Sequence, residues 1–141
     1  MARYNNIEAI DYIYKYSKYY GNVLYECEEL YKEEKGIILI NIFFNMIENI
    51  IKSVNEEYNN DFVNSINKLN NVLSEREINF LHKIRKYRNC YAHKDLNILF
   101  LDIDGIAYNY AEDDTATLLY KILSNKAYNI LVKIIKNKIK D

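Results

Sequence analysis

The fold is decided by residues 37–51, which read IILINIFFNMIENII. The first half of this stretch is apolar nearly all round, and such a helix has to be covered on every side. An apolar stripe then continues at three- and four-residue steps through Phe43, Ile47, Ile50, Ile51 and Val54. The stretch therefore predicts a central helix over residues 37–57. A short β-strand over residues 37–44 is the alternative, but the helical period continues beyond it.

Helical patterns lie on both sides of this segment. Residues 7–33 repeat apolar and aromatic side chains at helical steps, which predicts one long first helix. Gly21 weakens its middle, and Gly36 is placed as the left-handed residue that ends it. A shorter helix is expected over residues 61–73. The last helix is expected to start near Thr115 or Thr117.

Two local signals define the second half of the chain. The run Ser74-Glu75-Arg76-Glu77 is a capping box, in which the Ser74 hydroxyl and the Glu77 carboxylate satisfy each other's backbone N–H groups. It opens a third long helix. Asp104-Gly105 separates two apolar runs and predicts a tight β-hairpin over about residues 97–110. The sequence thus predicts one all-α domain over residues 1–141, an antiparallel four- to five-helix bundle with a short β-hairpin inserted before its last helix.

Charge is unevenly distributed, although the 141 residues carry a formal net charge of only −1. Residues 78–94 contain no acid, and residues 121–140 carry only basic charges, so a local positive patch is expected. The longest apolar run, residues 37–46, is interrupted by two asparagines and is too short to cross a bilayer. Cys27 and Cys90 both fall in helical patterns and are expected to be reduced thiols. We expect a cytoplasmic protein without membrane association.

The acid-free helix ends in the run Arg88-Asn89-Cys90-Tyr91-Ala92-His93. Arg88 lies in line with the apolar stripe Ile78, Leu81, Ile84 or Arg85, and Ala92, so it needs a carboxylate, a phosphate or a wet groove as its partner. Glu48 is the candidate carboxylate. A fixed cation near an imidazole can bind a phosphate and move protons around it without a metal. We therefore expect no metal and no cofactor. Arg76 and His82 repeat the spacing by chance, in the first turns of the same helix.

These residues resemble the signature of the HEPN domains of prokaryotic and eukaryotic RNases: an Arg, commonly followed by Asn or another polar residue, and a His after four to six positions. The order of helices along the chain resembles that family too. The resemblance implies an HEPN-like bundle and a metal-independent endoribonuclease whose composite site forms at a homodimer interface. His93 would be the general acid or base, Arg88 would hold the scissile phosphate and Asn89 would orient phosphate or His93. Such proteins often act as toxins or abortive-infection effectors against phage, beside an antitoxin protein. A tyrosine often found two residues after the histidine is replaced by Asp95, so regulation through that tyrosine is not expected.

Each of these residues has an alternative role. Arg88 can form a structural ion pair with Glu48, and His93 can cap the helix C-terminus. Lys86, Tyr87, Tyr91 and Lys94 are the candidate RNA-binding residues, although both tyrosines can instead pack in the core or at a dimer interface. The lysines after residue 121 form a solvated face or an RNA-backbone track. The rival function is a non-catalytic HEPN-like helical module that binds RNA or a protein.

Overall fold

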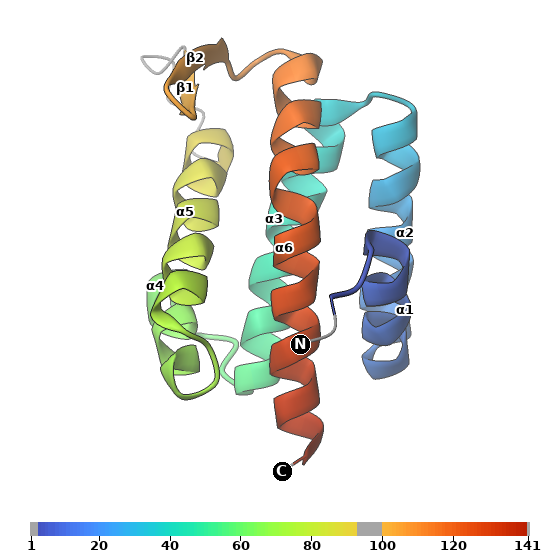
Figure 1. Cartoon of the computed structure of the whole chain (residues 1–141), viewed down its shortest axis with the longest axis vertical. Coiled ribbons are helices and arrows are strands. Elements are labelled where there is room, and N and C mark those ends of the chain that lie inside the picture. Colours follow the sequence, from blue (N-terminus) through green and yellow to red (C-terminus); the bar gives the residue numbers. More distant parts are fainter. Residues whose placement is uncertain (1–2, 93–99, 141) are drawn as a thin grey trace.

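The computed structural model describes residues 3–92 and 100–140. It is 78% helical, with six helices and one two-stranded antiparallel hairpin before the last helix (Figure 1). The elements are α1 (Asn6–Tyr16), α2 (Lys18–Lys32), α3 (Gly36–Asn55), α4 (Phe62–Asn67), a 3₁₀ turn η1 (Lys68–Asn71), α5 (Glu75–Ala92), β1 (Phe100–Ile103), β2 (Ile106–Asn109) and α6 (Asp113–Lys140). The mainly helical fold and the position of the hairpin are as predicted. The described residues form six helices where four to five were expected, chiefly because residues 7–33 form two helices.

Helix α3 is the central helix, as its apolar sequence predicts, and the alternative strand over residues 37–44 is wrong. It packs most extensively against α6, and also against α2, α4 and α5. The α3 and α6 helices run in the same direction: Gly36 contacts the start of α6, and Glu56, just after α3, pairs with Lys138 near its end. Phe43 lies edge-on to Tyr120 and Tyr128 at the centre of this contact.

Helix α3 also has the length and hydropathy of a membrane-spanning helix, which the prediction from residues 37–46 alone did not anticipate. The helix is 20 residues long, and its most apolar 18-residue window has a mean hydropathy of 1.6. Of that window, 44% is buried against the rest of the protein. Residues Phe43, Ile47, Ile50 and Ile51 are fully buried in one core with the other helices. Its apolar character is therefore used for packing, as in the core helix of a soluble domain.

The predicted single helix over residues 7–33 is wrong, because the chain turns back at Ser17. Ser17 has extended backbone angles (φ −150°, ψ 115°), ends α1 and caps α2 by accepting from the Tyr20 N–H. The two helices form an antiparallel pair in which Tyr25 bonds to Asp11 and packs against Tyr14. A Cβ atom on Gly21 would lie 2.5 Å from Cβ of Tyr14. Gly21 therefore permits close approach of the two helices and does not merely weaken one.

Gly36 is likewise not the left-handed residue that ends a helix. Glu34 takes that conformation (φ 58°), after α2 has ended at Lys32. A Cβ atom on Gly36 would lie 2.1 Å from the carbonyl oxygen of Asp113. The Asp113 carboxylate in turn accepts from the Ile37 N–H at 2.9 Å. Gly36 is thus required by the close contact between the starts of α3 and α6.

The shorter helix predicted over residues 61–73 is only partly right, because it consists of α4 followed by the 3₁₀ turn η1 and ends at Asn71. The capping box and the hairpin turn are confirmed. Ser74 and Glu77 form the reciprocal capping box, with backbone-to-side-chain distances of 2.9 and 3.2 Å. Asp104 and Gly105 both have positive φ (52° and 85°), as a two-residue hairpin turn requires. Helix α6 starts at Asp113, slightly before the predicted Thr115 or Thr117.

Candidate functional site

Arg88 lies on α5 at its contact with α3 and α4. Its guanidinium is 3.4 Å from a carboxylate oxygen of Glu48 on α3, the predicted partner. Its Cζ atom also lies 5.1 Å from the centre of the Phe62 ring, which is buried at the start of α4. Its side chain is 25% exposed. The ion pair and the aromatic face therefore hold the arginine in place without removing it from solvent.

Glu48 joins two cations. Its second carboxylate oxygen is 2.7 Å from Nζ of Lys52, one turn along α3. The side chains of Lys52 and Glu48 are 17% and 18% exposed, so both are mostly buried. The trio carries one net positive charge. That charge favours binding of an anion such as a phosphate over a neutral ligand.

A pocket of about 380 Å³ opens beside Arg88 between α3 and α5. Its walls include Asn41, Phe44, Asn45, Glu48, Arg88 and Ala92. Asn41 donates to the carbonyl oxygen of Ile37 at 2.8 Å, which fixes its amide and leaves its oxygen as an acceptor. The Nε atom of Arg88 is buried and has no hydrogen-bond acceptor among residues 3–92 and 100–140. The pocket thus combines the Arg88 cation with two carboxamides.

The sequence analysis did not identify Asn41 and Asn45 as site residues. It noted them only as polar interruptions of the apolar run over residues 37–46. A signal was present. Two polar residues four apart on an otherwise apolar helix share one face, and a shared polar face on a core helix indicates an opening to solvent. Lys52 also lies on that face, one turn beyond Glu48, and was not singled out.

The inner face of α5 differs from the predicted stripe at its end. Tyr91, and not Ala92, is buried there, while Ala92 is exposed. The Tyr91 ring packs on Phe44 and edge-on to Tyr110, and burial raises the pKa of its hydroxyl. Its ring therefore faces the core, which agrees with packing and leaves no exposed face for an RNA base.

The other candidate residues of α5 are more accessible. Lys86 is exposed, and Asn89 and Tyr87 are partly buried. The Tyr87 hydroxyl donates to the carbonyl oxygen of Asp102 at 3.2 Å and so fastens α5 to the hairpin. Cys90 is a free, partly buried thiol whose pKa is raised by burial. His93 and Lys94 lie outside the described residues, so their predicted roles stay predictions.

His82, the chance match to the signature, lies elsewhere and is already bonded. Its Nε2 atom is 2.8 Å from the amide oxygen of Asn67, and Nε of Arg85 donates to its Nδ1 atom at 3.3 Å. Burial, followed by the charges of Arg85 and Lys86, lowers the pKa of its imidazole. These contacts favour a neutral ring with a packing role.

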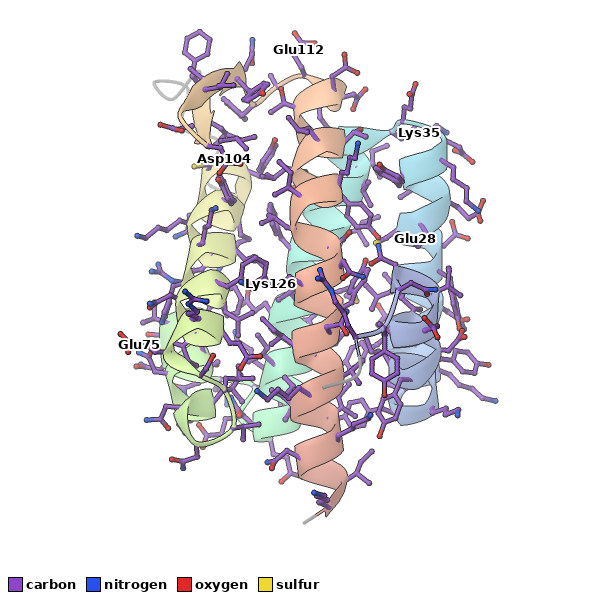
Figure 2. The ribbon with its side chains drawn as sticks, viewed as in Figure 1. Glu28, Lys35, Glu75, Asp104, Glu112 and Lys126 are labelled. Atoms are coloured by element: carbon purple, nitrogen blue, oxygen red, sulfur yellow. The ribbon has the colours of Figure 1, made fainter. Side chains whose placement is uncertain are left out.

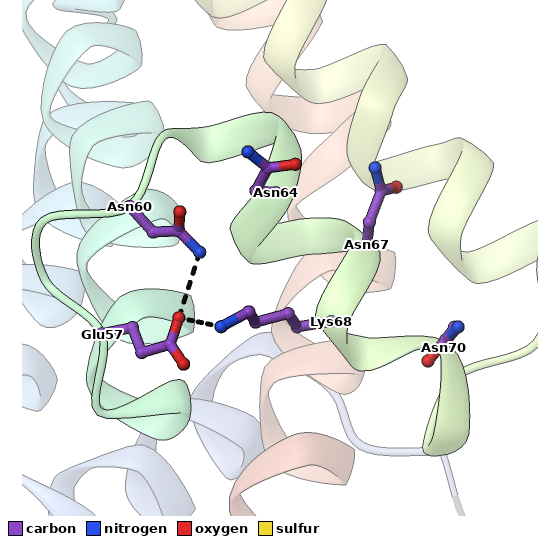
Figure 3. Close-up of a pocket in the computed structure, with 6 residues that line it drawn as sticks. All are labelled: Glu57, Asn60, Asn64, Asn67, Lys68 and Asn70. Carbon is purple, nitrogen blue, oxygen red and sulfur yellow. Dashed lines mark hydrogen bonds and ion pairs between the residues drawn. The ribbon is translucent and has the colours of Figure 1, made fainter.

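Figure 3 shows a second polar pocket, of about 630 Å³, at the turn between α3 and α4. Four asparagines line it with an ion pair, and the set is Glu57, Asn60, Asn64, Asn67, Lys68 and Asn70. Glu57 accepts from Asn60 at 3.1 Å and from Lys68, so its charge is already neutralised. This pocket shares none of the residues around Arg88.

Within residues 3–92 and 100–140, no group of three or more His, Cys, Asp or Glu side chains is arranged to hold a metal ion. Comparisons with known protein families, with curated proteins and with solved structures gave no match. The site is therefore interpreted from its own chemistry.

Proposed function

We propose that this protein is a metal-independent endoribonuclease of the HEPN type, which acts as a cytoplasmic homodimer in a toxin–antitoxin or phage-defence system. One observation supports this most directly: Arg88 is held by Glu48 and Phe62 and still lies beside an open pocket. A guanidinium fixed in this way can bind a phosphate through its free edge with little loss of side-chain entropy.

The chemistry follows from the roles of three residues of the signature, Arg88, Asn89 and His93, contributed by two protomers. His93 removes the proton of a ribose 2′-hydroxyl, whose oxygen attacks the adjacent phosphorus. The bond from phosphorus to the 5′-oxygen breaks, and a histidine returns a proton to the leaving oxygen. The products are a 2′,3′-cyclic phosphate and a 5′-hydroxyl. Arg88 stabilises the charge that develops on the phosphate, and Asn89 orients phosphate or His93.

A second protomer completes the site in this proposal. Helix α5 continues to Ala92. If the helical geometry continues by one residue, Arg88 and His93 point about 140° apart and cannot meet on one phosphate. Pairing across a two-fold axis brings the Arg88 of each protomer towards the His93 of the other.

The test is RNA cleavage by the purified protein and by matched variants. We expect His93→Ala to slow cleavage by about 10²–10⁴-fold, the usual contribution of a general acid or base. Arg88→Ala is expected to cost about 10²–10³-fold, and Arg88→Lys nearly as much, because a lysine lacks the planar fork. Arg76→Ala and His82→Ala are the controls, since they carry the same residue types on the same helix.

Circular dichroism has to show that every variant keeps its helical content. Equal cleavage by the wild type and by the two signature variants would refute the proposal. So would equal losses in the signature and control variants.

The Glu48–Arg88 ion pair also favours a second candidate, a non-catalytic RNA- or protein-binding module. A carboxylate that already neutralises Arg88 would then serve stability alone. In that case the protein binds its partner, cleaves no RNA, and loses only stability in Arg88→Ala.

A further inference from the structure

We propose that the groove between α6, α5 and the N-terminal segment binds single-stranded RNA. Its partner is the same as that of the proposed ribonuclease, but its residues are different. The groove has a volume of about 530 Å³. Tyr4, Ile130 and Val132 form its apolar part, and Arg3, Lys126, Lys133 and Lys136 supply its charge.

The cations outnumber the acids in this groove. Glu77 is the one carboxylate among its lining residues, and it is bonded to Lys133 at 2.8 Å. Lys126 and Lys136 are exposed and form no salt bridge with the described residues. With a rise of about 1.5 Å per residue, they lie about 15 Å apart along the α6 axis. Two cations at that separation can bind successive phosphates of a polyanion, whereas a single small anion would reach only one of them.

Each of these two lysines lies over an aromatic ring. Nζ of Lys126, which lines the groove, is 4.7 Å from the centre of the Phe80 ring on α5, beside it. Figure 2 shows Lys126 on the edge of α6 that faces α5. Nζ of Lys136 is 4.9 Å from the Tyr4 ring centre and 5.1 Å from that of Tyr12. The groove is thus a positively charged channel lined by one aromatic ring, that of Tyr4, and flanked by the Phe80 and Tyr12 rings, which its lysines cover. Cations beside aromatic rings are the usual form of a single-strand binding surface.

The placement of lysine ammonium groups over aromatic rings favours binding of nucleic acid over binding of an acidic peptide. When an ammonium group moves from a ring to an arriving anion, the ring face is uncovered. A nucleotide uses both groups, because its phosphate takes the lysine and its base stacks on the ring. A peptide carboxylate takes only the lysine and leaves an apolar ring in water.

The experiment measures binding of a fluorescein-labelled, single-stranded 2′-O-methyl RNA of about 12 nucleotides by fluorescence anisotropy. This RNA lacks the free 2′-hydroxyl, so the proposed ribonuclease reaction cannot destroy it. We expect the exposed double variant K126Q/K136Q to bind about tenfold more weakly at about 100 mM salt. The slope of log K against log salt should fall in magnitude by about 1.4, since each lost phosphate contact removes about 0.7.

Three further variants distinguish RNA binding from binding of any polyanion. K121Q/K140Q removes two exposed lysines of α6 that do not line the groove, and it should bind within about twofold of wild type. Phe80→Leu keeps every charge, and it should weaken binding about tenfold with an unchanged salt slope. Thermal melting checks that Phe80→Leu remains folded. Tyr12→Leu tests ring loss at the other end of the row.

Absence of binding by the wild type would overturn the proposal, as would equal losses in the groove and control variants. If Phe80→Leu and Tyr12→Leu both bind like wild type and poly-glutamate competes as well as unlabelled RNA, the groove instead binds acidic protein segments. A protein that binds this RNA normally in Arg88→Ala but no longer cleaves ordinary RNA would support both sites separately. RNA binding without any cleavage would leave this inference standing and refute the ribonuclease.

Discussion

Replacing Glu48 by glutamine tests whether the Lys52–Glu48–Arg88 trio stabilises the fold. The substitution keeps the shape of the side chain and one carbonyl oxygen, but it leaves two cations beside a neutral amide. Glu48 is 2.7 Å from Lys52 and 3.4 Å from Arg88, and the three side chains are 17–25% exposed. An exposed pair contributes up to about 1 kcal/mol, and breaking a buried pair costs about 3–5 kcal/mol. For this mostly buried trio we expect a loss of about 2 kcal/mol, between those limits.

The corresponding change in melting temperature follows from the size of the chain. With about 2.1 cal/mol/K per residue, unfolding of 141 residues has an entropy of about 300 cal/mol/K. A loss of about 2 kcal/mol then lowers Tm by about 7 °C, which calorimetry resolves easily. Because the charges are partly buried, most of this difference should persist at about 1 M salt.

Glu29→Gln is the matched control. Glu29 lies 3.3 Å from Lys32 on α2, but the two side chains are 57% and 70% exposed. We expect its Tm to stay within about 2 °C of wild type, because solvent screens an exposed pair. If Glu48→Gln melts no lower than Glu29→Gln, the trio contributes nothing to stability and the reasoning is refuted.

Three further predictions concern the frame around the site. Gly36→Ala should lower the free energy of unfolding by about 1–3 kcal/mol, because its Cβ atom would overlap the Asp113 carbonyl; a urea midpoint equal to wild type would contradict this. Ser74→Ala should cost about 1 kcal/mol through loss of the α5 cap, measured in the same urea titration, and an unchanged midpoint would show that the cap is dispensable. Burial raises the pKa of the Cys27 thiol from 9.0 to about 12, so at pH 9 it should react with iodoacetamide far more slowly in native protein than in urea. The unfolded thiol loses its proton near pH 9 and the folded one only near pH 12, so this thiol lowers stability as pH rises between these values, and Cys27→Ala should show a smaller fall than wild type; an equal fall in both proteins would count against burial of this thiol in solution.

Local sequence signals predicted the structure correctly where a turn or a helix cap requires particular residue types. Asp104-Gly105 and the Ser74–Glu77 capping box are of this kind, and both were found as expected. The break at Ser17 was missed because the apolar stripe continues across it in phase. The turn is seen in the extended backbone of Ser17 and in the tertiary contact between Gly21 and Tyr14, and the apolar pattern of the sequence contains neither.

The candidate site was predictable in part. Arg88 in line with an apolar stripe implied a partner, and Glu48 is that partner. The pocket depends on which face of α3 is left open, and this is set by how α5 packs along α3. No periodicity within a single helix contains that information, so Asn41 and Asn45 were not identified.

The pairing of α3 with α6 also has a consequence for synthesis of the protein on the ribosome. The most apolar helix of the fold packs chiefly against a helix that begins more than 50 residues later in the chain. The N-terminal segment is also bonded to this later helix, α6, through the backbone of Tyr4 and the side chain of Asn129. Contacts this distant in sequence form late in folding, because the intervening loop has to close first. A nascent chain therefore exposes the apolar surface of α3 until α6 has emerged, and during that interval it is a substrate for chaperones and prone to aggregation.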